Sequence, residues 1–243
     1  MNQAIAHNHT SVIRRARVRR RGAAPALISA LALMCVVSAC TQSDDGDSTT
    51  KVNGSIHVPA GKPAAAVSTV NGSIHIDDNA AVTSATTVNG GVHLGEHATA
   101  TSLSSVNGSI TLGKGAQLSG AASSVNGELS LGEGADITGS LSNVNGKIIL
   151  TAAHVGGGIK TVTGSISIMG SSRVEGGILV EKGASELLQM VRENPRIVIG
   201  PGATVQGELR FERTVRLYVS DKATIGTVTG ATPISFTGDK PPD

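Results

Sequence analysis

The stretch Val70-Asn71-Gly72-Ser73-Ile74-His75-Ile76 decides the fold, because close copies of it recur along the chain. Copies begin at Val52, Val70, Val88, Val106, Val125, Val144 and Val162, and Thr163 replaces the asparagine in the last. Successive copies are 18 or 19 residues apart, and a degenerate copy is expected at 174–180, only 12 residues further on. A fixed period of this length indicates a repeat architecture.

The residues within each copy predict short strands. Ile74 and Ile76 alternate with polar neighbours, as in a strand with one face in a core. Glycine-rich breaks such as 113–115 mark corners. Further apolar columns are Ala80/Ala98/Ala116/Ala135, Val82/Ala100/Leu118/Ile137 and Val67/Ala85/Leu103/Ala121/Ile159. We therefore predict an all-β, single-stranded parallel β-helix (β-solenoid) with about 18–19 residues per coil.

The alternative is an antiparallel meander, since Asn-Gly between apolar runs is a strong hairpin signal. A turn, however, would accept Asp or Gly as readily as an unchanged asparagine. In a parallel solenoid the asparagines would lie about 4.8 Å apart and hydrogen-bond in a ladder. This ladder would comprise Asn53, Asn71, Asn89, Asn107, Asn126 and Asn145.

The rest of the chain divides by composition. We expect a signal peptide at 1–39, a lipidated cysteine and polar tether at 40–50, and regular coils at 51–180. An insertion at 181–196 contains a short amphipathic helix near 184–193, ended by Pro195. We expect it to pack on the solenoid rather than bind a partner. Further coils at 197–238 and a loose tail at 239–243 complete the chain.

The N-terminus has the features of a secretory signal. Residues 1–39 hold six arginines and no acid, and an apolar run at 23–37 ends in small residues. This run is shorter than the roughly 20 apolar residues that span a membrane. Residues 1–13 precede the arginines and suggest a misassigned start codon.

The segment Val37-Ser38-Ala39-Cys40 resembles the lipobox of bacterial lipoproteins. The resemblance implies that Cys40 is acylated, that the signal is cut before it, and that the membrane is a partner through this anchor. Thr41, rather than Asp, follows the cysteine, which by resemblance implies the outer membrane. The alternative is an ordinary signal with a chance cysteine.

Composition limits the remaining functions. Lys and Arg number 20, so removing the six arginines of 1–39 leaves 14 basic against 18 acidic residues, which disfavours nucleic-acid binding. Cys35 would leave with the signal and Cys40 would carry lipid, so no thiol remains for a disulfide, metal or nucleophile. Aromatic residues make up 1% of the chain, so we expect a thin aliphatic core.

Over residues 51–180 the repeat resembles adhesin-like β-solenoid domains of bacterial envelope proteins, and it is similar to bactofilins. The resemblance implies a scaffold or adhesin-like surface, with an envelope protein or a glycan as partner and no catalytic residues to transfer. Bactofilins polymerise end to end in the cytoplasm, so self-association through coil ends is the alternative. The lipobox departs from that family.

The candidate chemical groups are few. His57, His75 and His93 should form an outward column about 4.8 Å apart, a weak metal candidate because collinear rings converge poorly. Asp77-Asp78 is interpreted as a solvated corner rather than part of a calcium-dependent polysaccharide-cleaving site. Residues 199–207 resemble the hexapeptide repeat of left-handed β-helix acyltransferases, whose cytoplasmic thioester donor a secreted protein would not meet. We therefore expect no enzyme, no cofactor and no metal.

Overall fold

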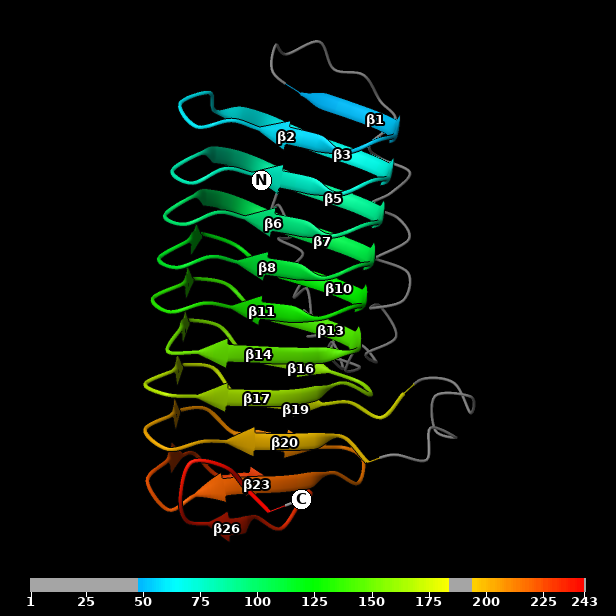
Figure 1. Cartoon of the computed structure of the whole chain (residues 1–243). Helices are drawn as coiled ribbons and strands as arrows, with labels where there is room; N and C mark the ends of the chain where they lie inside the picture. The colour runs from blue at the N-terminus through cyan, green and yellow to red at the C-terminus, as the bar shows by residue number, and fades with distance from the viewer. Residues whose placement is uncertain (1–47, 184–193, 243) are drawn as a thin grey trace, which may run out of the picture.

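The computed structural model describes residues 48–183 and 194–242, which form one parallel β-solenoid (Figure 1). Every strand pair in the described residues is parallel. The predicted parallel β-solenoid is therefore confirmed, and the antiparallel meander is wrong. The ten-stranded sheet contains one strand from each coil. Its strands are β2 (Ile56–Val58), β4 (Ile74–Ile76), β6 (Val92–Leu94), β8 (Ile110–Leu112), β11 (Leu129–Leu131), β14 (Lys147–Thr151), β17 (Ser165–Met169), β20 (Arg196–Ile199), β23 (Arg216–Ser220) and β26 (Ile234–Phe236).

The sixteen-stranded sheet begins as one row of strands and then divides into two. The first row is β1 (Thr49–Asn53), β3 (Ala64–Asn71), β5 (Ala81–Asn89) and β7 (Thr99–Asn107). One branch is β9 (Gln117–Leu118), β12 (Asp136–Ile137), β15 (His154–Val155), β18 (Arg173–Val174), β21 (Thr204–Val205) and β24 (Thr224–Ile225). The other is β10 (Ala122–Asn126), β13 (Leu141–Asn145), β16 (Ile159–Thr161), β19 (Ile178–Val180), β22 (Leu209–Phe211) and β25 (Val228–Thr229).

The division follows one extra residue. Strand β7 pairs with both β9 and β10, because the first 19-residue coil adds Gly120 between the two. As a result, Ala122 rather than Ala121 pairs with Leu103 and is buried. The predicted column that contained Ala121 is therefore wrong by one residue at this position.

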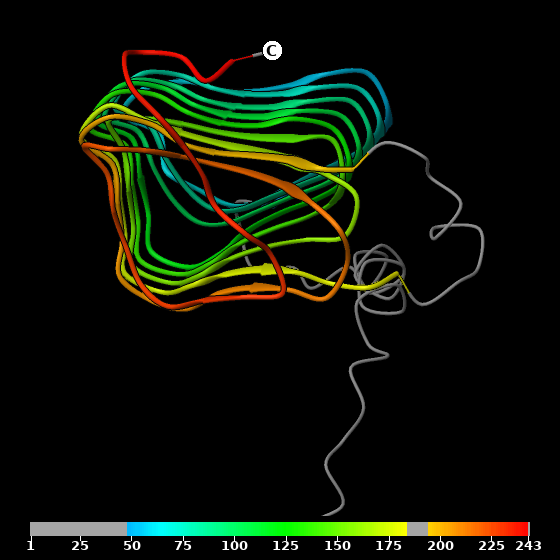
Figure 2. The ribbon, with the colours of Figure 1, turned by 90° about the horizontal axis from the view of Figure 1, so that it is seen from below.

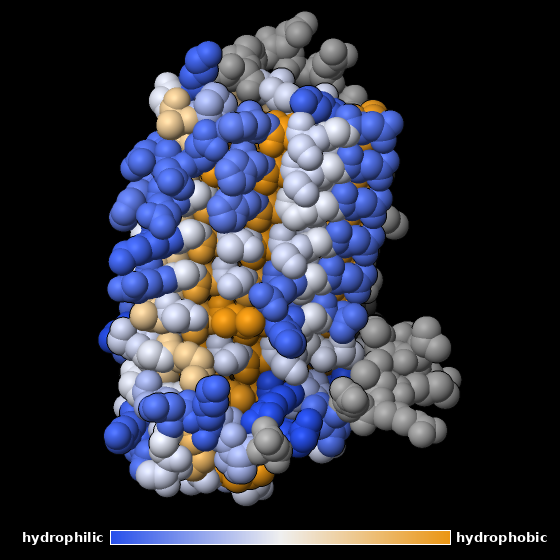
Figure 3. All heavy atoms as spheres, viewed as in Figure 1, coloured by the Kyte–Doolittle hydropathy of each residue, from blue (hydrophilic) through white to orange (hydrophobic). Residues whose placement is uncertain are grey.

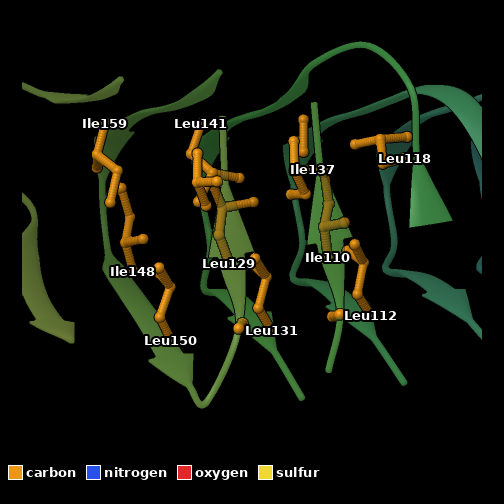
Figure 4. Packing of buried hydrophobic residues seen from close by; sticks show 14 of the residues in the cluster. Ile110, Leu112, Leu118, Leu129, Leu131, Ile137, Leu141, Ile148, Leu150 and Ile159 are labelled. Carbon is orange, nitrogen blue, oxygen red and sulfur yellow. The ribbon is translucent and has the colours of Figure 1, made fainter. Parts of the chain in front are cut away.

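The core is aliphatic and follows the predicted columns. Ile110, Leu129 and Ile148 stack in register on successive strands of the ten-stranded sheet (Figure 4). Each of them is at most 1% exposed. The alanine column Ala80/Ala98/Ala116/Ala135 is buried as predicted, and Ala153 and Ala203 are buried as well. By contrast, the first valine of the first two copies lies at the surface: Val52 is 65% exposed and Val70 37%.

The degenerate copy at 174–180 is wrong. Val174 pairs with Val155 and Ile178 with Ile159, so this segment belongs to the sixteen-stranded sheet and not to a new Val-Asn-Gly corner. The glycine-rich segment after Val174 matches the one after Val155, which forms the corresponding corner of the preceding coil. The predicted helix near 184–193 lies outside the described residues.

The C-terminal segment closes one end of the solenoid. After β25 the chain crosses the end of the last coil before reaching β26 (Figure 2). Ala231 packs against the core in this crossing. Residues 239–242, expected to be loose, include Pro242, whose carbonyl accepts a hydrogen bond from Arg196 Nη2 (2.9 Å). No membrane-spanning helix is found among the residues described.

Candidate functional surface

The outer corner of each coil carries an asparagine ladder. Asn71 Nδ2 donates to Asn53 Oδ1 at 3.0 Å, and the same bond repeats along the next three asparagines at 2.9–3.1 Å. Thr163 Oγ1 donates to the Val144 carbonyl (3.0 Å) and lies 3.3 Å from Asn145 Oδ1, so the hydroxyl that replaces asparagine keeps a bond to the preceding coil. The amides that the sequence predicts to stack therefore do so from Asn53 to Asn126.

A second ladder, which the sequence analysis missed, lies inside the same corner. Thr69 Oγ1 donates to the Gly54 carbonyl (3.0 Å), and Thr87 and Ser105 make the same bond to the glycine of the preceding coil. The signal was present, because a polar residue precedes the valine at every corner after the first. These residues are Thr69, Thr87, Ser105, Ser124, Asn143 and Thr161, and all are buried.

Glycine is required at this corner by close approach as well as by backbone conformation. A Cβ on Gly108 would lie 2.0 Å from the carbonyl oxygen of Gly90, and a Cβ on Gly72 2.3 Å from that of Gly54. Positive φ holds for Gly54 (105°) but does not account for Gly72 or Gly108. Close approach of the neighbouring coil therefore selects glycine at Gly72 and Gly108.

The histidine column has the predicted register and faces outward. His57, His75 and His93 pair on β2, β4 and β6, and the side chains of His57 and His75 are 63% and 54% exposed. The His57 and His75 rings meet edge to face at 5.7 Å, whereas the His75 and His93 rings stack at 4.9 Å. Figure 3 shows vertical stripes of similar hydropathy, as expected where like side chains of successive coils stack in columns.

Asp77 joins the upper part of this column. Its Oδ2 lies 2.7 Å from His57 Nε2 and its Oδ1 3.4 Å from His75 Nε2. Asp78 instead accepts a hydrogen bond from the Glu96 backbone N–H (2.7 Å). The paired acids thus form a corner, as predicted, but Asp77 also balances charge on the histidines when these are protonated.

His93, the third member of the column, has a lowered pKa. Burial lowers its pKa, the neighbouring His75 lowers it further, and Asp78 acts in the opposite direction. In the described part of the chain, no three His, Cys, Asp or Glu side chains are arranged to hold a metal ion. Cys40 lies outside that part, so its acylation stays a prediction.

A second ionic column lies on the branch β12–β15–β18. His154 Nδ1 contacts Asp136 Oδ1, and His154 Nε2 lies 3.4 Å from Glu175 Oε1. The two carboxylates face opposite sides of one ring, so they cannot share a metal with it. This arrangement is an exposed charge ladder of small energetic value.

Searches against family models, curated proteins and solved structures find no match to this chain.

Proposed function

We propose that this protein is a lipid-anchored, non-enzymatic scaffold of the bacterial outer membrane with an adhesin-like surface. The observation that carries the proposal is the ten-coil solenoid, whose outer corner repeats the same asparagine in its first six coils. Such a rod presents many equivalent contacts along its length. The segment 41–50 would link its first strand to an acylated Cys40.

Mass spectrometry of the N-terminal peptide, from protein purified out of membranes, tests the anchor. We expect acyl chains on Cys40 and their loss in Cys40→Ala. Cys35→Ala is the matched control, since Cys35 lies within the proposed signal and should leave acylation intact. An unmodified Cys40 in a soluble protein with an intact signal would overturn the proposal.

The alternative is end-to-end polymerisation, and two features argue against it. Lys51 is in register with the buried Thr69, so a charge occupies the first rung of the inner ladder. Its Nζ donates to the Ser55 carbonyl (2.8 Å). A charge at such a position is a known protection of edge strands. At the other end, the crossing segment lies over the last coil (Figure 2).

Sedimentation of the purified chain decides between the two. We expect a monomer at all concentrations, whereas concentration-dependent filaments would favour the alternative. Lys51→Thr, which continues the column of Thr69 and Thr87, tests the first edge directly by removing its charge.

A further inference from the structure

The corner where the last coils enter the ten-stranded sheet gathers positive charge. Arg196 and Arg216 pair in register on β20 and β23. Lys147 precedes them in the same outward column, separated by Ser165. Arg213 lies on the turn before β23, and Lys182 directly follows Glu181 at the equivalent turn. We call these five residues the basic corner; Figure 3 shows hydrophilic side chains among apolar ones at this end of the face.

The carboxylates next in sequence to Lys182 and Arg213 are engaged elsewhere. Glu181 Oε1 lies 2.6 Å from Lys160 Nζ, and Glu212 Oε1 lies 3.0 Å from Arg210 Nη2. Both partners, Lys160 and Arg210, belong to the sixteen-stranded sheet. Within residues 48–183 and 194–242, no ion pair includes a member of the basic corner.

Like charges opposite each other on neighbouring strands destabilise a sheet. Arg196 is nevertheless held in place: its guanidinium lies 4.9 Å from the centre of the Tyr218 ring and donates to the Pro242 carbonyl. Arg216 is exposed. The two arginines thus occupy neighbouring positions at strand spacing, and guanidinium groups bind planar anions through paired hydrogen bonds.

We propose that the basic corner binds an anionic polysaccharide through its carboxylate or sulfate groups. Nucleic acid fits less well, because base stacking needs exposed aromatic rings and Phe211, Tyr218 and Phe236 are 5–6% exposed. A lipid surface fits less well, because Ile234 is the sole exposed large apolar residue in this part of the described chain.

The position suits the proposed function, on which this step rests. The first strand and the basic corner lie toward opposite ends of the rod (Figure 1). A protein anchored near its first coil would therefore present the corner away from its own membrane. The corner would then give the adhesin-like surface a defined partner class.

Binding of polygalacturonate and of dextran sulfate to the full chain tests the proposal, with neutral dextran as a blank. The triple variant Lys147→Gln/Lys182→Gln/Arg216→Gln removes three cations whose side chains make no hydrogen bond or ion pair with other described residues. We expect it to weaken binding at least about tenfold at low salt, and less as salt rises. The arginines of residues 14–21 are common to all variants and cancel in this comparison.

The control triple Lys62→Gln/Lys114→Gln/Arg173→Gln changes net charge equally but lies elsewhere on the rod. Equal weakening in both triples, or no binding to either acidic polymer, would overturn the proposal. Tighter binding to duplex DNA or to phosphatidylglycerol vesicles would replace it with the corresponding partner. Binding that survives Cys40→Ala while acylation is lost separates this test from that of the anchor.

Discussion

The first coils and the last coils of the solenoid solve the same stacking problem differently. Strands β3, β5 and β7 run unbroken for eight or nine residues, and each corner repeats Val-Asn-Gly with its two ladders. After β7 the strands of the sixteen-stranded sheet shorten to between two and five residues, and from β18 onward the Val-Asn-Gly corner sequence is absent. There, individual side chains supplement the backbone pairing between coils.

Arg213 is the clearest example in the last coils. Its Nη1 donates to the Val162 carbonyl (3.1 Å). The coil that lies between these two residues in sequence contains the segment 184–193. In the regular coils a backbone N–H fills this role: Thr163 N donates to the Val144 carbonyl. A strict repeat therefore satisfies its corners by backbone stacking, whereas an interrupted repeat needs an individual long side chain.

The largest expected effect is at a glycine of the regular half. Gly108→Ala should lower the free energy of unfolding by about 3–5 kcal/mol, because its Cβ would collide with the Gly90 backbone. Gly54→Ala is the control, since its Cβ meets nothing within 4 Å and only φ is strained. We expect it to cost about 1–2 kcal/mol by urea denaturation. Equal costs would show that conformation, not stacking, selects glycine.

The next effect tests the irregular half. Arg213→Ala should cost about 1–3 kcal/mol, because it leaves the Val162 carbonyl without its donor. Arg210→Ala removes the same side chain from an exposed pair with Glu212 and should cost less than about 1 kcal/mol. Thermal unfolding of the two variants in parallel measures the difference, and a smaller loss in Arg213→Ala would remove the bridging role.

Asn143 marks the point where the inner ladder departs from hydroxyls. Its Nδ2 donates to the Gly127 carbonyl, but its buried Oδ1 has no partner. Asn143→Thr should stabilise the fold by about 1 kcal/mol, since it removes an unsatisfied acceptor. Ser124, one coil earlier, already donates a hydroxyl hydrogen bond to the Gly108 carbonyl, so Ser124→Thr should change the free energy of unfolding little. Denaturation midpoints compare the two, and a loss in Asn143→Thr would contradict this explanation.

The corner after each strand of the ten-stranded sheet offers a smaller test. His97 has φ of 54°, whereas glycine stands at the equivalent Gly115 and Gly134. His97→Gly should stabilise the fold by about 0.5–1 kcal/mol, because glycine tolerates the left-handed region. Asn79 (φ 59°) accepts this region more readily, so Asn79→Gly should be nearly neutral. Calorimetry of both variants measures the contrast.

The smallest effect is pH dependence in the first coils. Burial and His75 lower the pKa of His93 below its unfolded value of about 6.5. The folded state therefore favours neutral His93, and stability should fall as pH drops through 6.5 toward the lowered value. His93→Thr, which matches Thr111 in the next coil, should reduce this loss. Denaturation at pH 7.5 and pH 5 tests it, and an unchanged slope would exclude His93 as the source.

The sequence by itself determined the period, the parallel coil, the aliphatic columns and the register of the asparagines. It could do so because stacking places equivalent residues of successive coils against each other. The apolar positions of one coil therefore recur in every regular coil and together form the core. The outward histidines followed from the same alternation of sides along a strand.

Tertiary structure alone decided the features that depend on neighbouring coils. The extra residue at Gly120 divides a sheet because it forms a corner between β9 and β10, and the copy at 174–180 belongs to another sheet because its pairing partner is Val155. Likewise Asp77 reaches two histidines, Arg213 reaches Val162, and the C-terminal segment crosses the last coil. These features depend on which residues of different coils lie close enough to contact each other. The repeating pattern within one coil contains no information about that.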